Sequence, residues 1–139
     1  MNKSVKVITG FLGISMFMFG VLKFVNPFKN WYSQQIFLSD FPLPILSYWM
    51  GQLGEIIVGV AFIFLLFNHK KISSLKLNLI FNLGNFSIII MMLVAFYVHA
   101  HPNVPADVLP LKISPPYIPG FFLLLAIANI YFKTKTIVK

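Results

Sequence analysis

Four long apolar stretches dominate the chain and limit the folds open to it. They run over residues 5–25, 45–67, 75–98 and 115–132. A helix rises about 1.5 Å per residue, so about 20 residues cross the roughly 30 Å hydrocarbon core of a membrane. Only 10% of the residues are charged, which would leave a water-soluble fold without an adequate polar surface. We therefore expect an all-α integral membrane protein, a four-helix bundle that forms one domain over residues 1–139.

The placement of the lysines predicts which side of the membrane each terminus faces. If the N-terminus is inside, the inner segments carry eight lysines and the outer connections carry three, which are Lys23, Lys29 and Lys112. Inner segments are enriched in positive charge, so both termini are expected in the cytoplasm. The net charge of +8 is then a matter of topology. The chain has no arginine for bidentate contacts to bases or phosphates, and we expect no nucleic-acid partner.

The connections between the stretches differ in kind. Residues 26–44 form a long outer loop. Part of this loop could be a short helix that lies in the membrane interface through the side chains of Trp31, Tyr32, Ile36, Phe37 and Leu38. Residues 99–119 hold six prolines and cannot be helical throughout. The first turn of the fourth span is expected to hold Pro115 or Pro116, because a missing amide hydrogen is harmless there.

Glu55 lies within the second apolar stretch and is one of only three acidic residues. An ionised carboxylate costs roughly 3 kcal/mol at the centre of a membrane, so it is expected to be neutral, paired or facing a protein-lined cavity. Tyr48 and Gln52 lie on the same side of this helix. The spacing of Gly51, Gly54 and Gly59 around Glu55 predicts close helix packing. Two interpretations stay open: a hydrogen bond that holds helices together, or a site for a proton, ligand or ion.

Gly13, Gly20 and Lys23 share one face of the first stretch, with Lys23 at its outer end. The glycines predict a second close helix contact. The lysine could extend its ammonium group to the lipid headgroups, or it could pair with Glu55. Glu55 lies about 15 Å below the outer boundary at helical rise, so a direct pair requires a shallower Glu55 or a bridging water.

The third stretch carries Asn82, Asn85 and His99 along one predicted face, together with Asn78 and Met92. These side chains could hydrogen-bond between helices or line a ligand site. His99, His101 and Asp107 are weak candidates for a metal site, because a two-residue spacing needs a third, well-placed ligand. We predict no metal site.

The sequence contains few of the residues and motifs that catalysis requires. There is no cysteine, which excludes thiol chemistry and disulfides. No phosphate-binding loop or zinc-protease motif occurs. We predict no catalytic residues and expect no enzymatic activity from the chain on its own.

Several short motifs together resemble the DoxX-like family of small four-helix membrane proteins. They are Gly20-Val21-Leu22-Lys23, an outer loop with aromatic residues and proline, the run Gly51-Gln52-Leu53-Gly54-Glu55-Ile56-Ile57-Val58-Gly59, and a third span ending in histidine. The resemblance implies a multi-pass protein of the bacterial cytoplasmic membrane. It also implies a membrane or redox protein partner, and it makes a quinone a possible cofactor, because the namesake is associated with a thiosulfate:quinone oxidoreductase.

These observations lead to one main hypothesis and two alternatives. The main hypothesis is an accessory subunit or a protein that binds a lipophilic small molecule, in an outer pocket walled by Tyr48, Gln52, Glu55 and Lys23. The first alternative is a quinone-linked oxidoreductase subunit, in which Glu55 exchanges a proton and Lys23 or His99 holds a quinone carbonyl. The second is a small proton-coupled carrier, which the absence of an internal repeat disfavours. Besides lipid, a second copy of the chain is a possible partner.

Overall fold

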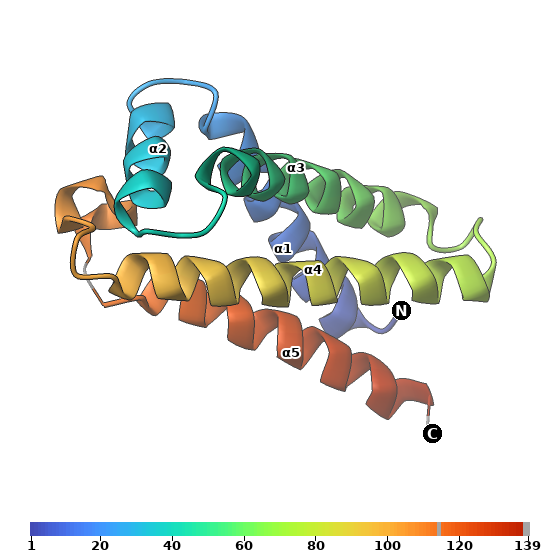
Figure 1. Ribbon diagram of the computed structural model, residues 1–139. Helices are drawn as coiled ribbons and strands as arrows, with labels where there is room; N and C mark the ends of the chain where they lie inside the picture. The colour runs from blue at the N-terminus through green and yellow to red at the C-terminus, as the bar shows by residue number, and fades with distance from the viewer. Residues whose placement is uncertain (114, 138–139) are drawn as a thin grey trace.

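The computed structural model describes residues 1–113 and 115–137, and all regular secondary structure in these ranges is helical. Figure 1 shows the helices, and the all-α prediction is confirmed. Their bounds are α1 Lys3–Leu22, α2 Phe28–Leu38, α3 Pro44–Asn68, α4 Ser74–Ala100 and α5 Tyr117–Ile137, with the short 3-10 helices η1 Ala106–Val108 and η2 Pro110–Lys112 between α4 and α5.

Four helices, α1, α3, α4 and α5, are long and apolar enough to cross a membrane. Their outward faces carry large apolar side chains such as Phe67 and Leu75, which are 80% and 78% exposed. An apolar exterior on this scale suits contact with hydrocarbon rather than water. The chain thus has the features of a multi-pass membrane protein.

The helix bounds differ most from the predicted spans in the first and the last helix, and the last runs to Ile137 rather than to about Phe132. The first helix ends at Leu22 rather than near Val25. The last begins at Tyr117, so neither Pro115 nor Pro116 lies in its first turn as predicted. Pro116 disfavours a helical backbone at the residue before it, and its carbonyl accepts the amide of Gly120, which places it just ahead of the helix.

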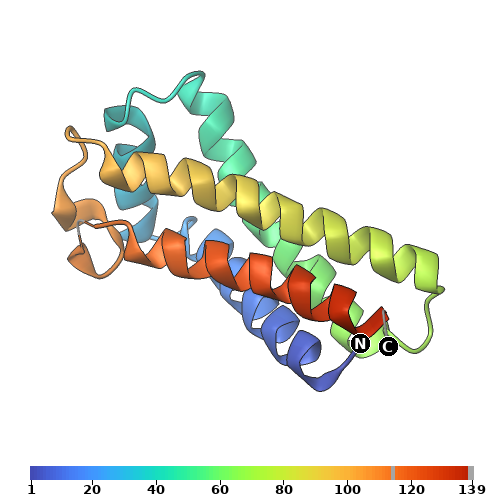
Figure 2. The ribbon, with the colours of Figure 1, turned by 90° about the horizontal axis from the view of Figure 1, so that it is seen from below.

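The four long helices lie side by side, with both chain ends and the α3–α4 turn at the same end of the molecule (Figures 1 and 2). The side chain of Asn2 donates to the carbonyl of Phe132 at 3.4 Å and links the start of α1 to the end of α5. The opposite end holds α2 and the two 3-10 helices. In both views α2 runs across the long axis of the molecule.

The closest helix contact joins α1 to α3, and it sets the position of the polar site. A Cβ atom on Gly59 would lie 2.5 Å from the backbone nitrogen of Phe17, so only glycine permits this approach. The opposing pairs Gly10–Leu66, Gly13–Phe62 and Gly20–Ile56 give an antiparallel register. In this register the end of α1 lies opposite residues 52–55. The first two turns or so of α3 therefore extend beyond α1.

The helix α2 packs against the part of α3 that α1 does not reach. The rings of Tyr32 and Tyr48 are 4.8 Å apart, and Tyr32 and Ile36 form a buried cluster with Val98 of α4. The short helix predicted within residues 26–44 is therefore present. The side chains of Tyr32 and Ile36 face the protein rather than the outside.

Candidate functional site

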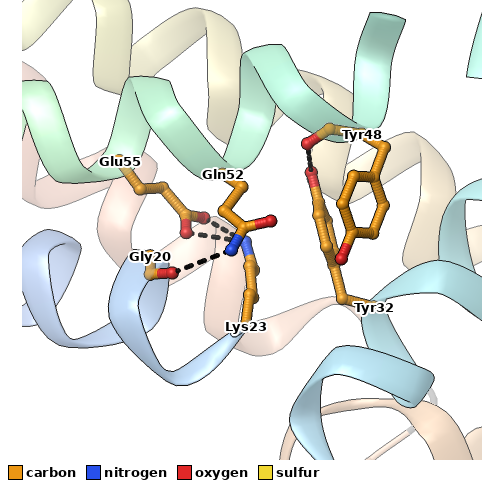
Figure 3. A network of polar contacts seen from close by, with 6 residues as sticks. All are labelled: Gly20, Lys23, Tyr32, Tyr48, Gln52 and Glu55. Carbon is orange, nitrogen blue, oxygen red and sulfur yellow. Dashed lines mark hydrogen bonds and ion pairs between the residues drawn. The ribbon is translucent and has the colours of Figure 1, made fainter. Parts of the chain in front are cut away.

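A buried ion pair joins the end of α1 to α3. The ammonium Nζ of Lys23 lies 2.6 Å from each carboxylate oxygen of Glu55 (Figure 3). The side chains of Lys23 and Glu55 are 17% and 9% exposed. Of the two alternatives for Lys23, the structure shows the pair. The expected mismatch in depth does not arise, because α1 ends about two turns short of the start of α3.

The local sequence explains why the two charges meet. Lys23 is the C-cap residue of α1, and Gly20 precedes it by nearly one turn. A Cβ on Gly20 would lie 3.0 Å from the carbonyl oxygen of Gln52 and from the backbone nitrogen of Ile56. This glycine lets the last turn of α1 lie directly on α3, so the lysine stem needs to reach only one neighbouring turn.

Two further side chains surround the ammonium group. The ring of Tyr32 lies with its centre 4.0 Å from Nζ of Lys23, in a cation–π contact, and its hydroxyl donates to the carbonyl of Tyr48 at 3.0 Å. Burial, and then the negative charge of Glu55, raise the pKa of Tyr32. Tyr32 therefore remains a protonated hydrogen-bond donor. Gln52 donates from Nε2 to the carbonyl of Gly20 at 3.5 Å.

The ion pair forms part of the wall of a partly open cavity of about 510 Å³, which is lined by residues of α1, α2, α3, α4, the 3-10 helices and the start of α5. Most of its lining is apolar, and Lys23, Tyr32, Gln35, Glu55 and His99 are the polar or ionisable side chains with the deepest burial. The Gln35 amide donates to the carbonyl of Val108 and thereby fixes α2 to η1. A pocket of this size, mostly apolar with a few converging polar groups, is the usual form of a small-molecule site.

A smaller cavity of about 310 Å³ lies on another side of the ion pair, between the α1–α2 connection, α2 and α3. Its polar lining includes Lys29, Tyr48 and Gln52. Lys23 borders both cavities. The residues that line the smaller cavity include no carboxylate.

The predicted ligand-binding residues divide among four places. Lys23, Glu55 and His99 line the larger cavity, while Tyr48 and Gln52 line the smaller one. Tyr48 and Gln52 thus line a different cavity from Glu55, and the Tyr32 ring lies against that of Tyr48 at an angle of 36°.

The asparagines of α4 belong to neither cavity. Asn82 is exposed, and its predicted place on the inward face is wrong. That face centres on Phe81 and Ile88, and Asn82 is turned by about 100° from Phe81. Asn85 is buried, but it lies in a different polar cluster.

This second cluster joins three helices. Asn129 of α5 donates from Nδ2 to Thr9 Oγ1 of α1 and to Asn85 Oδ1 of α4, both at 3.1 Å. The amide of Asn85 donates to the carbonyl of Phe81 at 2.8 Å. All three side chains are fully buried. The sequence motifs did not predict a role for Thr9 or Asn129, although an asparagine in the middle of the fourth apolar stretch is a signal of this kind.

The five glycines around the site all lie close to a neighbouring element. Gly13, Gly20 and Gly59 lie in the α1–α3 contact, and Gly54 faces Met91 of α4. Gly51 lies beneath the hydroxyl of Tyr32 rather than against a spanning helix.

The histidines and Asp107 do not come together. Within residues 1–113 and 115–137 no group of three metal-ligating side chains occurs. His99 is buried beside the larger cavity, whereas His101 is only partly buried, with its ring centre 5.7 Å from that of Tyr97. Asp107 is exposed, with Lys112 4.0 Å away.

Tyr32 and Gln35 line the larger cavity, although the sequence motifs did not predict either as a ligand-binding residue. Together with Ile36 they follow helical spacing within α2 and form its buried face. That spacing was the available signal, but an interfacial helix would show the same pattern.

The chain matches no family model, no curated protein and no solved structure among those compared. Fold and site together define a helical, multi-pass membrane protein with an ion-paired cavity.

Proposed function

We propose that the larger cavity binds a lipophilic small molecule with a polar group, and that the chain acts as a binding protein or accessory subunit in the bacterial cytoplasmic membrane. The observation that carries this proposal is the cavity of about 510 Å³ whose wall includes the Lys23–Glu55 pair. The apolar lining suits a lipophilic body, and the ion pair offers both a donor and an acceptor to its polar end.

The proposal includes a four-helix bundle with both termini in the cytoplasm, as in the DoxX-like family that the motifs resemble. Seven described lysines support this orientation: Lys3, Lys6, Lys70, Lys71, Lys76, Lys133 and Lys135 belong to the end that holds the termini and the α3–α4 turn. Lys23, Lys29 and Lys112 belong to the other end. Positive charge is concentrated on the cytoplasmic side of membrane proteins.

A buried ion pair can also serve packing alone, and the energetics argue against that role here. Replacing such a pair by apolar residues is often neutral or stabilising, so a packing role is a weak reason to keep it. A pair that borders a cavity, by contrast, can exchange one of its partners for a ligand group. Because intramembrane charges are costly and rare, each is by default a candidate for a functional site.

The test is ligand retention by the purified protein. Wild type, Glu55→Gln and Asn129→Ala would be purified in mild detergent, and bound lipophilic compounds extracted and compared by mass spectrometry. We expect a stoichiometric compound with wild type and with Asn129→Ala, which perturbs the other polar cluster, and its loss from Glu55→Gln. If Glu55→Gln matches wild type in folding, partner association and retained compounds, the proposal is wrong.

A quinone is the second candidate, and one arrangement favours it. Lys23 and His99 line the same cavity as Glu55, so hydrogen-bond donors for quinone oxygens and a group able to pass a proton lie together. Reducing a quinone takes two electrons, from a redox partner, and two protons. Glu55 is suited to passing those protons.

Tryptophan fluorescence can test the quinone directly. Trp31 lines the larger cavity and Trp49 the smaller, so Trp49→Phe and Trp31→Phe each leave a reporter for one cavity. Decylubiquinone should quench the fluorescence of Trp31 saturably, as a bound ligand does. It should quench Trp49 without saturation, as quinone dissolved in the detergent does. Equal, non-saturating quenching of both, with no quinone in the purified protein, would rule this candidate out.

A further inference from the structure

The smaller cavity has its own chemistry, distinct from the larger one. Lys29, Asn30 and Ser33 of α2 and Trp49 and Gln52 of α3 contribute to its wall. Except for Lys23, none of its lining residues belongs to the larger cavity. A ligand bound here would therefore be a second ligand.

The charges of this cavity favour an anion. Two lysines line it and no acidic residue does. Lys23 is already paired with Glu55, whereas Lys29 has no carboxylate within 4.0 Å in the described part of the chain. Lys29 lies in the first turn of α2, which begins at Phe28. The partial positive charge of a helix N-terminus adds to the attraction for an anion.

Gln52 adds a requirement for a hydrogen-bond donor. It has no exposed surface, and its Oε1 has no partner in the described part of the chain. In Figure 3 this oxygen points away from Gly20 and toward the side where Tyr32 and, beyond it, Tyr48 lie. A buried acceptor without a partner costs about 1–3 kcal/mol, so a ligand that supplies a donor gains by pairing with it. Among the donors that phospholipid headgroups carry, an ammonium group would be repelled by the unpaired Lys29, which leaves a hydroxyl group.

The surroundings of the cavity place it at a lipid surface. It lies at the end of the molecule that holds α2, and its rim includes Ile45 and Trp49, which are 68% and 47% exposed. Tryptophan is enriched where membrane proteins meet lipid headgroups. An exposed apolar rim beside a cationic pocket suits a molecule that has acyl chains next to an anionic head.

We propose that the smaller cavity binds the headgroup of an anionic glycerophospholipid that carries a hydroxyl group, the chemistry of phosphatidylglycerol. The phosphate lies near Lys29 and the start of α2, and a glycerol hydroxyl donates to Oε1 of Gln52. The acyl chains lie along Ile45 and Trp49. A free phosphodiester shares this headgroup chemistry but has no acyl chains to contact the apolar rim.

The test measures which lipids surround Trp49. The Trp31→Phe variant would be reconstituted in several preparations of phosphatidylcholine nanodiscs. Each preparation contains the same fraction of one test lipid with brominated acyl chains, which quench tryptophan at short range. We expect phosphatidylglycerol to quench more than phosphatidylcholine. It should also quench more than phosphatidylmethanol, which has the same charge and no hydroxyl.

Two variants and one control assign the contacts. Lys29→Gln should lower the preference for phosphatidylglycerol about fivefold, the effect of about 1 kcal/mol per lysine near an anionic surface. Gln52→Met, close in size, should make phosphatidylglycerol equivalent to phosphatidylmethanol. Lys112→Gln removes an exposed lysine at the same end and should change nothing.

Each contrary result overturns a defined part. Equal quenching by phosphatidylglycerol and phosphatidylcholine, or equal effects of Lys29→Gln and Lys112→Gln, would overturn the site. Equal quenching by phosphatidylglycerol and phosphatidylmethanol would overturn the hydroxyl contact, even if Gln52→Met failed to fold. Full displacement by soluble glycerophosphoglycerol would overturn the assignment to a lipid.

Discussion

The molecule contains two clusters of buried polar side chains. They differ in charge, in whether all their hydrogen bonds are made within the protein, and in whether a cavity lies beside them. The Thr9–Asn85–Asn129 cluster is neutral, its hydrogen bonds are made within the protein, and none of its residues lines either cavity. The Lys23–Glu55 cluster is charged, and it borders two cavities. Burial alone therefore does not identify a functional site in this chain. A buried polar group that borders open space is the more informative sign.

The largest expected effect comes from separating the two charges. Lys23→Met leaves Glu55 buried without its cation, and we expect unfolding in detergent to become easier by about 3–5 kcal/mol. The double variant Lys23→Met/Glu55→Met should regain most of this stability but bind no ligand in the larger cavity. A single variant as stable as wild type would mean that the pair differs little from the neutral cluster.

The next effect tests the helix contact that brings the charged cluster together. Gly59→Ala places a Cβ against the backbone of Phe17, and we expect a loss of about 1–3 kcal/mol in denaturant unfolding. Gly120→Ala is the matched control, because no atom lies within 4 Å of its added Cβ. Equal effects of both substitutions would show that the close α1–α3 contact does not hold the site.

The neutral cluster should matter for stability only. Asn85→Ala removes an interhelical hydrogen bond, which is worth about 0.6 kcal/mol on average in a membrane protein and up to about 1.7. Asn82→Ala, on the same helix but exposed, should be nearly neutral. Neither change should alter ligand retention. Loss of ligand from Asn85→Ala would remove the functional distinction between the clusters.

The smallest effect is a dependence on pH that only the charged cluster should show. The pKa of Tyr32 is raised in the folded protein, so the folded state keeps its proton where the unfolded chain loses it. The stabilisation is complete below the ordinary tyrosine pKa near 10 and is lost as the pH rises above it. In unfolding measured from pH 8 to 11, Tyr32→Phe should lose stability less steeply than wild type. An unchanged slope would contradict the burial of Tyr32 beside Glu55, and Asn129→Ala should keep the wild-type slope.

The sequence predicted those features that depend on one segment at a time. Each apolar stretch has the length of a spanning helix, and Glu55 and Lys23 stand out because a charge in such a stretch is costly. The division of the polar residues between two cavities could not be predicted in this way. It depends on the α1–α3 register, which the chain sets through the contacts of Gly13, Gly20 and Gly59.

The remaining errors also have physical causes. A polar stripe on α4 gives no indication of where the buried face is centred, so Asn82 and Asn85 were predicted to lie on the same face. In the structure Asn82 is exposed and Asn85 is buried. The bond between Thr9 and Asn129 joins residues 120 positions apart, and no local pattern specifies it. For Tyr32, the amphipathic pattern of α2 fits a lipid surface as well as a protein surface.

The early end of α1 has a consequence for the backbone. The last four carbonyls of a helix have no partner within it, and in a bilayer each unsatisfied group costs several kcal/mol. A helix that stops about two turns below its neighbour must therefore find four donors nearby. The amides of Lys23, Phe24 and Val25 supply the carbonyls of Phe19, Val21 and Leu22, and Gln52 supplies that of Gly20. The chain can thus end α1 about two turns short of its neighbour, because each of its last four carbonyls accepts a hydrogen bond.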